Sequence, residues 1–177
     1  MAQAKRKQKF FDVDMPIIKK ETQLYGYDIK ELDKRIIAYD LTRLLRGKGT
    51  ILKLKVHVEG DKAVAEPIEI KIMPYFIRRM MRKGVNYIED AISTKCKDAV
   101  LRIKPFLITR KKVSKAVRKA LREKAHEEIT EYVKTKSVKT LFDEIMKNKI
   151  QKSLSLKLKK IYPLSLCEIR FFAIEKE

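Results

Sequence analysis

Residues 109–124 of this chain, TRKKVSKAVRKALREK, predict an amphipathic helix that divides the sequence into two parts of different character. Apolar residues recur at spacings of three and four, as they do along the buried face of a helix, namely Val113, Ala116, Val117, Ala120 and Leu121. Ala125, Ile129 and Tyr132 continue the pattern, so we predict one helix over about residues 111–133. Strand-like segments precede it, and mainly helical segments follow it.

Basic residues fill the first turns of this predicted helix, whereas Glu127, Glu128 and Glu131 lie near its end. This order opposes the helix dipole, and each misplaced charge costs roughly 0.3–1 kcal/mol. Folding alone therefore does not account for the arrangement, but a polyanion bound across the first half of the helix does. A solvated helix face remains the alternative. The residues predicted to bind this polyanion are Arg110, Lys111, Lys112, Lys115, Arg118, Lys119 and Arg122.

The composition indicates the same kind of partner. The 177 residues include 43 Lys and Arg against 23 Asp and Glu, which gives a net charge of +20. A chain with this excess repels itself unless an anion lies close, and nucleic acid is the first candidate and an anionic membrane surface the second. No apolar run approaches the roughly 18 residues of a membrane span. Of the two anionic partners we predict nucleic acid and no membrane.

A basic N-terminal arm supplies a second group of candidate RNA contacts. Residues 1–9, MAQAKRKQK, contain Lys5, Arg6, Lys7 and Lys9 and almost no apolar surface. Such a segment cannot bury enough apolar area to offset its ordering entropy, so we predict a disordered arm in the isolated protein. The length of the chain then favours a single domain over residues 10–177.

Alternating apolar residues predict several strands before the long helix. The clearest is residues 50–58, where apolar and charged residues alternate, and residues 63–73 return as the second strand of a hairpin. Further strands are expected over residues 10–13, 34–39, 85–95 and 99–108. Pro67 and Pro105 indicate an edge or a bulge in the strands that contain them.

Two short helices are expected between these strands. One covers residues 40–46 with Asp40 as its N-cap, and the other covers residues 74–83 with Pro74 at its first position. Basic residues in the last turns of the second helix are favoured by the helix dipole, so stability alone explains them. They are secondary candidates for RNA binding: Arg78, Arg79, Arg82 and Lys83.

The C-terminal part reads as helical, with one returning strand. Residues 138–146 predict a helix capped by Ser137, residues 150–161 fit a helix or a strand, and residues 164–174 predict a closing strand. The predicted fold class is α+β: an antiparallel-rich, β-barrel-like sheet over residues 10–109, with helices over residues 110–161.

The sequence offers no catalytic or metal-binding constellation. Residues 126–130, HEEIT, resemble the metalloprotease motif H-E-x-x-H, but Thr130 occupies the position of the second histidine ligand. Lys48 lies between two glycines, but the P-loop pattern is not met. The two cysteines form no C-x-x-C pair. We therefore predict no enzyme activity, no metal and no cofactor.

Several blocks of the chain, taken in order, resemble a family of ribosomal proteins. They are KFFDVDMP at residues 9–16, IIAYDLTRLL at 36–45, LKLKVHVEGDKAVAEPIEIKI at 52–72, LRIKPFLITRKKVSKAVRKALREKAHEEI at 101–129 and IYPLSLCEIRFFAIEK at 161–176. Together they resemble the S-three-a-e family of archaeal and eukaryotic small-subunit proteins, also called S-one. No block is a sharp motif by itself, and the ordered set carries the resemblance. The chain resembles the short archaeal form, which lacks a long C-terminal extension.

The resemblance implies a structural rRNA-binding protein with a barrel-like core and a helical C-terminal region. It implies a place on the platform of the small subunit, near the 3′ end of the small-subunit RNA and the mRNA exit, in the cytoplasm. Neighbouring small-subunit proteins are then expected partners, and mRNA near the exit is a further candidate. The basic arm and residues 110–122 become the expected rRNA contacts, and residues 150–161 are expected to be helical.

A free-standing RNA- or DNA-binding factor is the alternative from a different class of proteins. A translation, RNA-processing or chromatin protein would use the same basic residues for transient contacts. Sedimentation with or apart from ribosomal particles distinguishes the two readings.

Overall fold

The computed structural model describes residues 7–60 and 62–175, which fold into nine strands, four α-helices and one 3-10 helix. These elements confirm the predicted α+β class. Contacts within the chain divide it into two compact units, one of residues 1–39 and 52–68 and one of residues 40–51 and 69–177. The chain passes from one unit to the other within β4 (Thr50–Glu59) and β5 (Lys62–Ile72).

The first unit is built from a hairpin and three further strand segments. Its elements are β1 (Lys9–Met15), β2 (Lys20–Gly26), the 3-10 helix η1 (Ile29–Leu32), β3 (Ile36–Asp40) and most of β4 and β5. The strands β1 and β2 pair antiparallel, and β1 also pairs in parallel with β5 at Ala63 and Val64. Alternate residues of these strands are buried, among them Val13, Met15 and Leu54.

The strand β2 was not predicted from the sequence. Its inward residues Thr22 and Leu24 are only half-buried, and its outward residues Glu21, Gln23 and Tyr25 are exposed. This strand therefore lacks the strong apolar alternation by which a buried strand is recognised in sequence.

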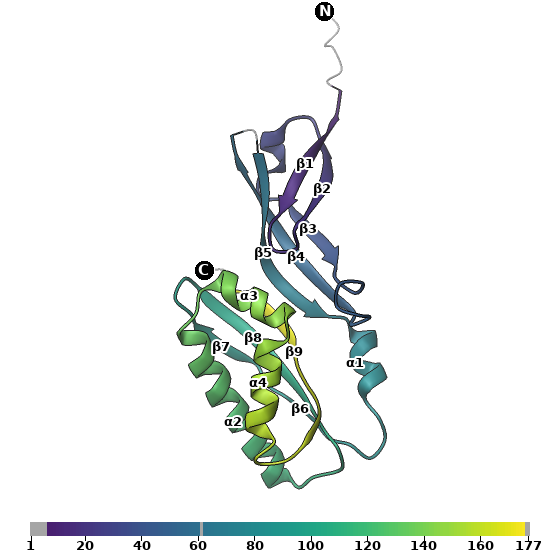
Figure 1. The fold of residues 1–177 in the computed structure, drawn as a ribbon, viewed down its shortest axis with the longest axis vertical. Coiled ribbons are helices and arrows are strands. Elements are labelled where there is room, and N and C mark those ends of the chain that lie inside the picture. The colour runs from purple at the N-terminus through teal and green to yellow at the C-terminus, as the bar shows by residue number, and fades with distance from the viewer. Residues whose placement is uncertain (1–6, 61, 176–177) are drawn as a thin grey trace, which may run out of the picture. The chain divides into compact units, whose positions relative to one another are not determined.

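The second unit packs helices against one face of a sheet. Besides the ends of β4 and β5, it contains α1 (Pro74–Met80), β6 (Tyr87–Glu89), β7 (Ile92–Lys95), β8 (Val100–Thr109), α2 (Lys115–Lys134), α3 (Val138–Met146), α4 (Lys149–Leu158) and β9 (Leu164–Ile174). Figure 1 shows α2 and α4 over β7, β8 and β9, and these elements contact one another. Helix α4 confirms the helical alternative for residues 150–158, whereas residues 159–161 form a turn beyond its end.

The closing strand β9 lies inside the sheet of the second unit. It pairs antiparallel with β5 on one side and with β8 on the other, and β8 also pairs with β6 and β7. The predicted antiparallel-rich sheet and closing strand are therefore confirmed. The sheet is not barrel-like in its hydrogen bonding, because the order of its described strands runs from β2 to β6 without closing.

Apolar side chains from the helices and the sheet form the core of the second unit. Helix α2 buries Leu121, Ala125, Ile129 and Val133, spaced by one helical turn. Phe142 of α3 packs edge-on against Phe172 of β9, with ring centroids 4.8 Å apart. These buried positions follow the apolar pattern of the sequence, which predicted helices for α2 and α3 and left residues 150–161 open between a helix and a strand.

Two register shifts occur between β8 and β9, and the first leaves one extra residue of β9 opposite Lys104 and Pro105. Lys104 pairs with Phe171 whereas Pro105 pairs with Ile169, so Arg170 has no partner on β8. The bulge predicted from Pro105 is thereby confirmed, since proline has no N–H for a regular ladder. Ile169 is 3% exposed and Phe172 is 1% exposed. The two residues between them, Arg170 and Phe171, are both half-buried outside this core.

Residues 42–47 form turns, and the helix predicted over residues 40–46 is wrong. The Asp40 carboxylate accepts hydrogen bonds from the Thr42 N–H at 2.7 Å and from the Thr42 hydroxyl. Arg46 and Gly47 both have positive φ angles, of 54° and 86°, which end any right-handed helical path. The segment is too short for its helix propensity to overcome these local preferences.

Candidate nucleic-acid interface

The segment between β8 and α2 is held by hydrogen bonds to its backbone. The buried Thr109 hydroxyl lies 2.7 Å from the Lys111 carbonyl oxygen, and the Asn86 side-chain oxygen accepts from the Val113 N–H at 2.8 Å. The Ser114 hydroxyl then caps α2 by accepting from the Val117 N–H. The backbone of residues 109–114 is therefore fixed while its charged side chains extend into solvent.

The predicted start of the long helix at residue 111 is wrong by one turn. Helix α2 begins at Lys115, because Ser114 provides the N-cap and because Thr109 and Asn86 engage the backbone of residues 111 and 113. Arg110, Lys111 and Lys112 therefore precede the helix. Lys115, Arg118, Lys119 and Arg122 lie in its first two turns.

The structure brings the predicted residues of the segment 110–122 together around the start of α2. All are exposed except Arg118, which is half-buried and whose Nε is buried without a hydrogen-bond partner. Lys119 makes a loose, exposed pair with Glu123 at 3.7 Å. Among the described residues no ion pair joins a carboxylate to Arg110, Lys111, Lys112, Lys115 or Arg122. These five form the α2-start cluster.

The acidic end of α2 contributes to the fold. This corrects the expectation from the helix dipole that the glutamates near the end of the helix have no folding explanation. Glu128 accepts a short hydrogen bond from Lys157 of α4, and Lys124 lies 3.0 Å from Glu127 and 3.6 Å from Glu128. The hydrogen bond from Lys157 lowers the pKa of Glu128, and the hydrogen bond to Glu127 raises the pKa of Lys124. Glu128 therefore joins α2 to α4, whereas Glu127 pairs with Lys124 of its own helix, and the basic start is left without a folding explanation.

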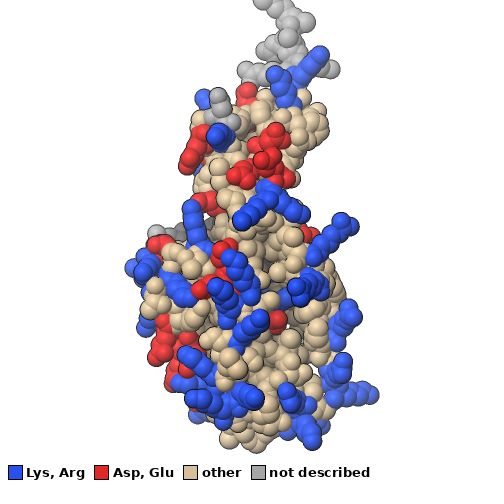
Figure 2. Space-filling view, in the orientation of Figure 1, with Lys and Arg blue, Asp and Glu red and all other residues tan. Residues whose placement is uncertain are grey.

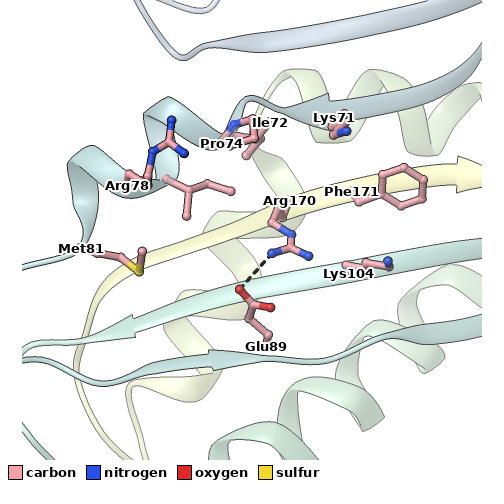
Figure 3. A pocket seen from close by; sticks show the side chains of 10 residues that line it. Lys71, Ile72, Pro74, Arg78, Met81, Glu89, Lys104, Arg170 and Phe171 are labelled. Atoms are coloured by element: carbon pink, nitrogen blue, oxygen red, sulfur yellow. Dashed lines mark hydrogen bonds and ion pairs between the residues drawn. The ribbon is translucent and has the colours of Figure 1, made fainter.

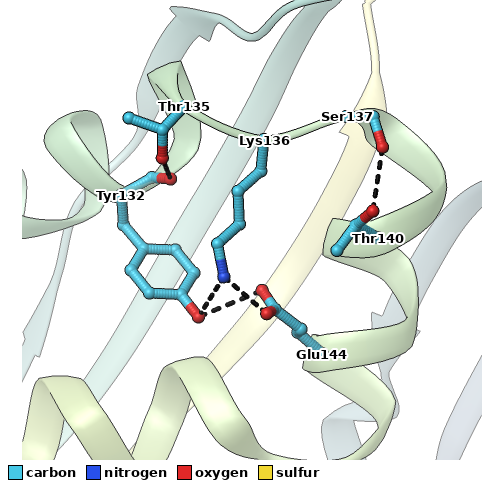
Figure 4. Close-up of polar contacts among 6 residues, drawn as sticks. All are labelled: Tyr132, Thr135, Lys136, Ser137, Thr140 and Glu144. Carbon is cyan, nitrogen blue, oxygen red and sulfur yellow. Dashed lines mark hydrogen bonds and ion pairs between the residues drawn. The ribbon is translucent and has the colours of Figure 1, made fainter.

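Other lysines of the second unit are likewise engaged in the fold. Figure 4 shows Lys136 between α2 and α3, where its ammonium group contacts the Tyr132 hydroxyl and the Glu144 carboxylate. Burial opposes its charge, but these hydrogen bonds outweigh burial and raise the pKa of Lys136. Lys48 donates to Glu168 at 2.5 Å and to Asn148 at 3.0 Å. The lysine of the Gly-Lys-Gly segment is therefore a structural cation.

The secondary candidates divide between a helix and the chain that follows it. Arg78 and Arg79 lie in the last turn of α1, where the helix dipole favours basic residues. The helix ends at Met80, so Arg82 and Lys83 lie beyond it, and the dipole does not explain their positions. All four side chains are exposed. A helix predicted over residues 74–83 is thus three residues too long.

The N-terminal arm lies only partly within the described residues. Lys5 and Arg6 lie outside them. Lys7 and Lys9 are exposed, and Lys9 is the first residue of β1, where it pairs with Gly26. These two lysines belong to the first unit, and the α2-start cluster belongs to the second.

Charge is distributed unequally between the two units. The second unit holds 31 of the 43 Lys and Arg and 14 of the 23 Asp and Glu, which is +17 of the net +20. Figure 2 shows Lys and Arg gathered over the part of this unit where α2 starts and α4 ends. A polyanion is therefore attracted mainly to the second unit.

A further group of basic residues, which sequence reasoning missed, lines a cavity of the second unit. Lys71 of β5, Lys104 of β8 and Arg170 of β9 lie around it with Arg78 of α1. Figure 3 shows these side chains on the same side of the strands. No sequence pattern joins residues this far apart, and the signals that pointed to this region were the secondary candidate Arg78 and the bulge expected at Pro105.

The described residues show no arrangement of groups for metal-dependent or nucleophilic chemistry. None of their His, Cys, Asp and Glu side chains form a group of three or more that could hold a metal ion. His126 Nδ1 lies 3.2 Å from Asp90 Oδ2. Burial, with a smaller effect of Glu168, raises the pKa of Cys167 to about 12, so this thiol stays protonated. None of the helices described here is long and apolar enough to cross a membrane.

Comparison with known proteins agrees with these features. The model of the ribosomal S3Ae family matches residues 4–177, almost the whole chain. The chain belongs to the ribosomal S3Ae family. This confirms the family that the ordered sequence blocks indicated, and a family of ribosomal structural components agrees with the prediction of no enzyme activity.

Curated relatives from archaea bear the name small ribosomal subunit protein eS1. The relative from Methanothermobacter thermautotrophicus is 27% identical over 122 residues, which are 67% of this chain and 63% of the relative. The relative from Nanoarchaeum equitans is 31% identical over 119 residues, covering 67% and 60%. The relative from Haloarcula marismortui is 25% identical over 138 residues, covering 77% and 65%. The chain thus spans about three fifths of the length of the S3Ae relatives that it matches.

Proposed function

We propose that this S3Ae chain is a structural component of the small ribosomal subunit and binds its rRNA through the α2-start cluster. The observation that carries the proposal is a group of five exposed cations that pair with no carboxylate among the described residues, on a backbone held by Thr109 and Asn86. A rigid group of this kind can contact several phosphates without a large loss of chain entropy. The names of the relatives and the family match support the ribosomal setting.

The finer location is part of the same proposal. The family resemblance favours the platform of the subunit near the mRNA exit, with neighbouring ribosomal proteins as partners and a cytoplasmic, ribosome-bound location. The N-terminal arm with Lys5, Arg6, Lys7 and Lys9 is proposed as a second rRNA contact. Arg78, Arg79, Arg82 and Lys83 are proposed as weaker contacts.

The first test is where the protein sediments. In sucrose gradients of cell lysate at moderate salt, a structural component remains with the small subunit in near-stoichiometric amount. Recovery mainly in the soluble top fractions would favour a free-standing RNA- or DNA-binding factor instead.

The second test is a charge-matched pair of triple variants. Replacing Lys111, Lys112 and Lys115 with Gln should weaken binding to rRNA fragments and flatten its dependence on salt. Each lost phosphate contact lowers the slope of log affinity against log salt by about 0.7–0.9, so three contacts lower it by about 2.1–2.7. The melting temperature should stay the same or rise slightly, because Lys115 opposes the helix dipole.

The matched control removes the same charge from the other end of α2 in the same unit. Lys95, Lys97 and Lys134 are exposed, and the Lys97 N–H donates to the carbonyl oxygen of Lys136, two residues beyond Lys134. Replacing these three with Gln should leave the salt slope close to that of the original protein. An equal loss of slope in both triple variants would show that only the net charge matters, and the proposed interface would then be wrong.

A further inference from the structure

The cavity of the second unit combines an apolar floor with a basic rim. Its volume is about 450 Å³, and it lies between α1 and the strands β5, β6, β8 and β9. Ile72, Ile77 and Phe171 supply apolar surface, and Ile72 and Ile77 belong to a buried apolar cluster with Phe106 and Ile108. Figure 3 shows the lining side chains in front of the strands, on the side away from the long helices. A cavity of this size takes a small planar group together with its substituents.

The bulge in β9 creates the cavity's most distinctive pair of side chains. In a regular strand, neighbouring residues point to opposite faces of the sheet. Because Arg170 is the extra residue of the bulge, Arg170 and Phe171 both line the cavity while Ile169 and Phe172 remain buried. Pro105 lies opposite this bulge on β8. The cavity therefore places a guanidinium group next to an aromatic ring.

The charges around the cavity favour an anionic ligand. Four cationic side chains line it, namely Lys71, Arg78, Lys104 and Arg170, against the single carboxylate of Glu89. Arg170 Nη1 lies 3.0 Å from Glu89 Oε1, which fixes both groups. The Lys104 ammonium group lies 5.3 Å from the centroid of the Phe171 ring. The rim remains positive even after the ion pair between Arg170 and Glu89 is counted.

We propose that this cavity receives one unpaired nucleotide of an RNA strand. A nucleotide carries a planar base and a phosphate in one unit, and these match the apolar floor with Phe171 and the basic rim. The Glu89 carboxylate can accept a hydrogen bond from an exocyclic amino group of the base. This inference rests on the proposed rRNA binding. It adds a second RNA-binding site, which contacts a base as well as phosphates.

Binding of a base, rather than of the phosphate backbone alone, is the property to test. The full-length protein is titrated with a short single-stranded RNA of adenosines and uridines, and with the same strand made abasic. Phe171→Leu keeps the apolar contact but removes the ring. It should lower affinity for the RNA about tenfold, as expected for the loss of one stacked base, and leave affinity for the abasic strand unchanged.

A pair of charge variants on β8 supplies the matched control. Lys104→Gln should lower the salt slope for both strands by about 0.7, one phosphate contact. Arg102 lies two residues away on the same face of β8, outside the cavity, and Arg102→Gln should have no effect. If Phe171→Leu fails to fold in a thermal melt, the comparison between Lys104→Gln and Arg102→Gln still decides the outcome.

Three results would overturn this proposal in different ways. In the first, Phe171→Leu and Lys104→Gln both bind RNA as well as the original protein does, while the α2-start triple variant binds it weakly. The cavity would then not be an RNA site, and the proposed function would stand. In the second, the original protein does not bind rRNA fragments, and both the proposed function and the nucleotide site in the cavity would be wrong. If a peptide rich in Glu and Leu binds and loses affinity in the cavity variants while RNA does not, the occupant is a protein segment.

Discussion

Lysines of this S3Ae chain fall into two groups according to what surrounds their ammonium groups. Lys48, Lys136 and Lys157 each contact a carboxylate that joins two elements of the second unit. Lys111 and Lys115 are exposed, and no carboxylate within the described residues pairs with them. Removing a lysine of the first group should weaken the fold, whereas removing one of the second group should weaken only the binding of an anion.

Glu128 provides a pH test of the first group. Its folded-state pKa lies below the ordinary value of 4.5, chiefly because Lys157 donates a hydrogen bond to it. The ionised carboxylate therefore contributes stability above about pH 4.5, and this contribution is lost as the pH falls through the folded-state pKa. Glu128→Gln should lower the free energy of unfolding at pH 7 by up to about 1 kcal/mol.

The difference between Glu128→Gln and the original protein should shrink as the pH falls below 4.5, and denaturant unfolding at several pH values measures it. Glu131→Gln is the control, because Glu131 is exposed on the same helix and has no ion pair among the described residues. A pH-independent difference would show that Glu128 acts through packing rather than through its charge.

At the scale of elements, the start of α3 shows how a distant residue can replace a predicted cap. The sequence favoured Ser137 as the N-cap, but the Ser137 hydroxyl contacts the Thr140 hydroxyl and makes no capping hydrogen bond. Instead, the Asp98 carboxylate accepts from the Val138 N–H at 3.2 Å. Residue 98 lies in the turn between β7 and β8, so this contact also ties α3 to the sheet.

A pair of alanine variants separates these two candidate caps. Asp98→Ala should cost about 1 kcal/mol, the usual loss for a helix cap, and lower the melting temperature by roughly 2–4 °C for a chain of this size. Ser137→Ala should cost less, because no backbone N–H loses a partner. Thermal melts of both variants make the comparison. A larger effect of Ser137→Ala would mean that the local cap predicted from the sequence is the one that holds α3.

Elements with a strong apolar pattern could be predicted from the sequence to within a residue or two. Residues 138–146 and 164–174 match α3 and β9, because each has a sustained apolar stripe or run and Pro163 separates β9 from the helix before it. The start of α2 was placed one turn too early, although Ser114 offers a local N-cap, because the contact of Asn86 with the backbone of Val113 comes from a residue remote in sequence. The cavity could not be predicted either, since its lining comes from five elements whose neighbourhood only the fold creates.

At the scale of the whole molecule, the sequence predicts that the net charge is positive, but it does not predict which part of the fold carries it. The sequence shows a net charge of +20, and the division into units shows that residues 40–51 and 69–177 carry most of it. The predicted single domain over residues 10–177 stays a proposal. It is supported by β5, a single continuous strand whose first part belongs to one unit and whose last part belongs to the other.

We expect the two units to unfold together, because melting either one removes pairing partners from the shared strand β5. Calorimetry should then give one transition whose calorimetric and van't Hoff enthalpies agree. The triple variant at Lys95, Lys97 and Lys134 serves as a control for general effects of charge on the transition. Two resolved transitions would show that the units are separate domains.

The position of β9 in the sheet has a consequence for how the protein is synthesised. Its partners β5 and β8 both precede it in the chain, and β8 ends at Thr109. Residues 110–163 take about 3–11 s to be added at roughly 5–20 residues per second. During that time the facing edges of β5 and β8 lack their common neighbour. A newly made chain therefore passes through a highly basic, half-open state, in which premature capture by RNA competes with insertion of its central strand.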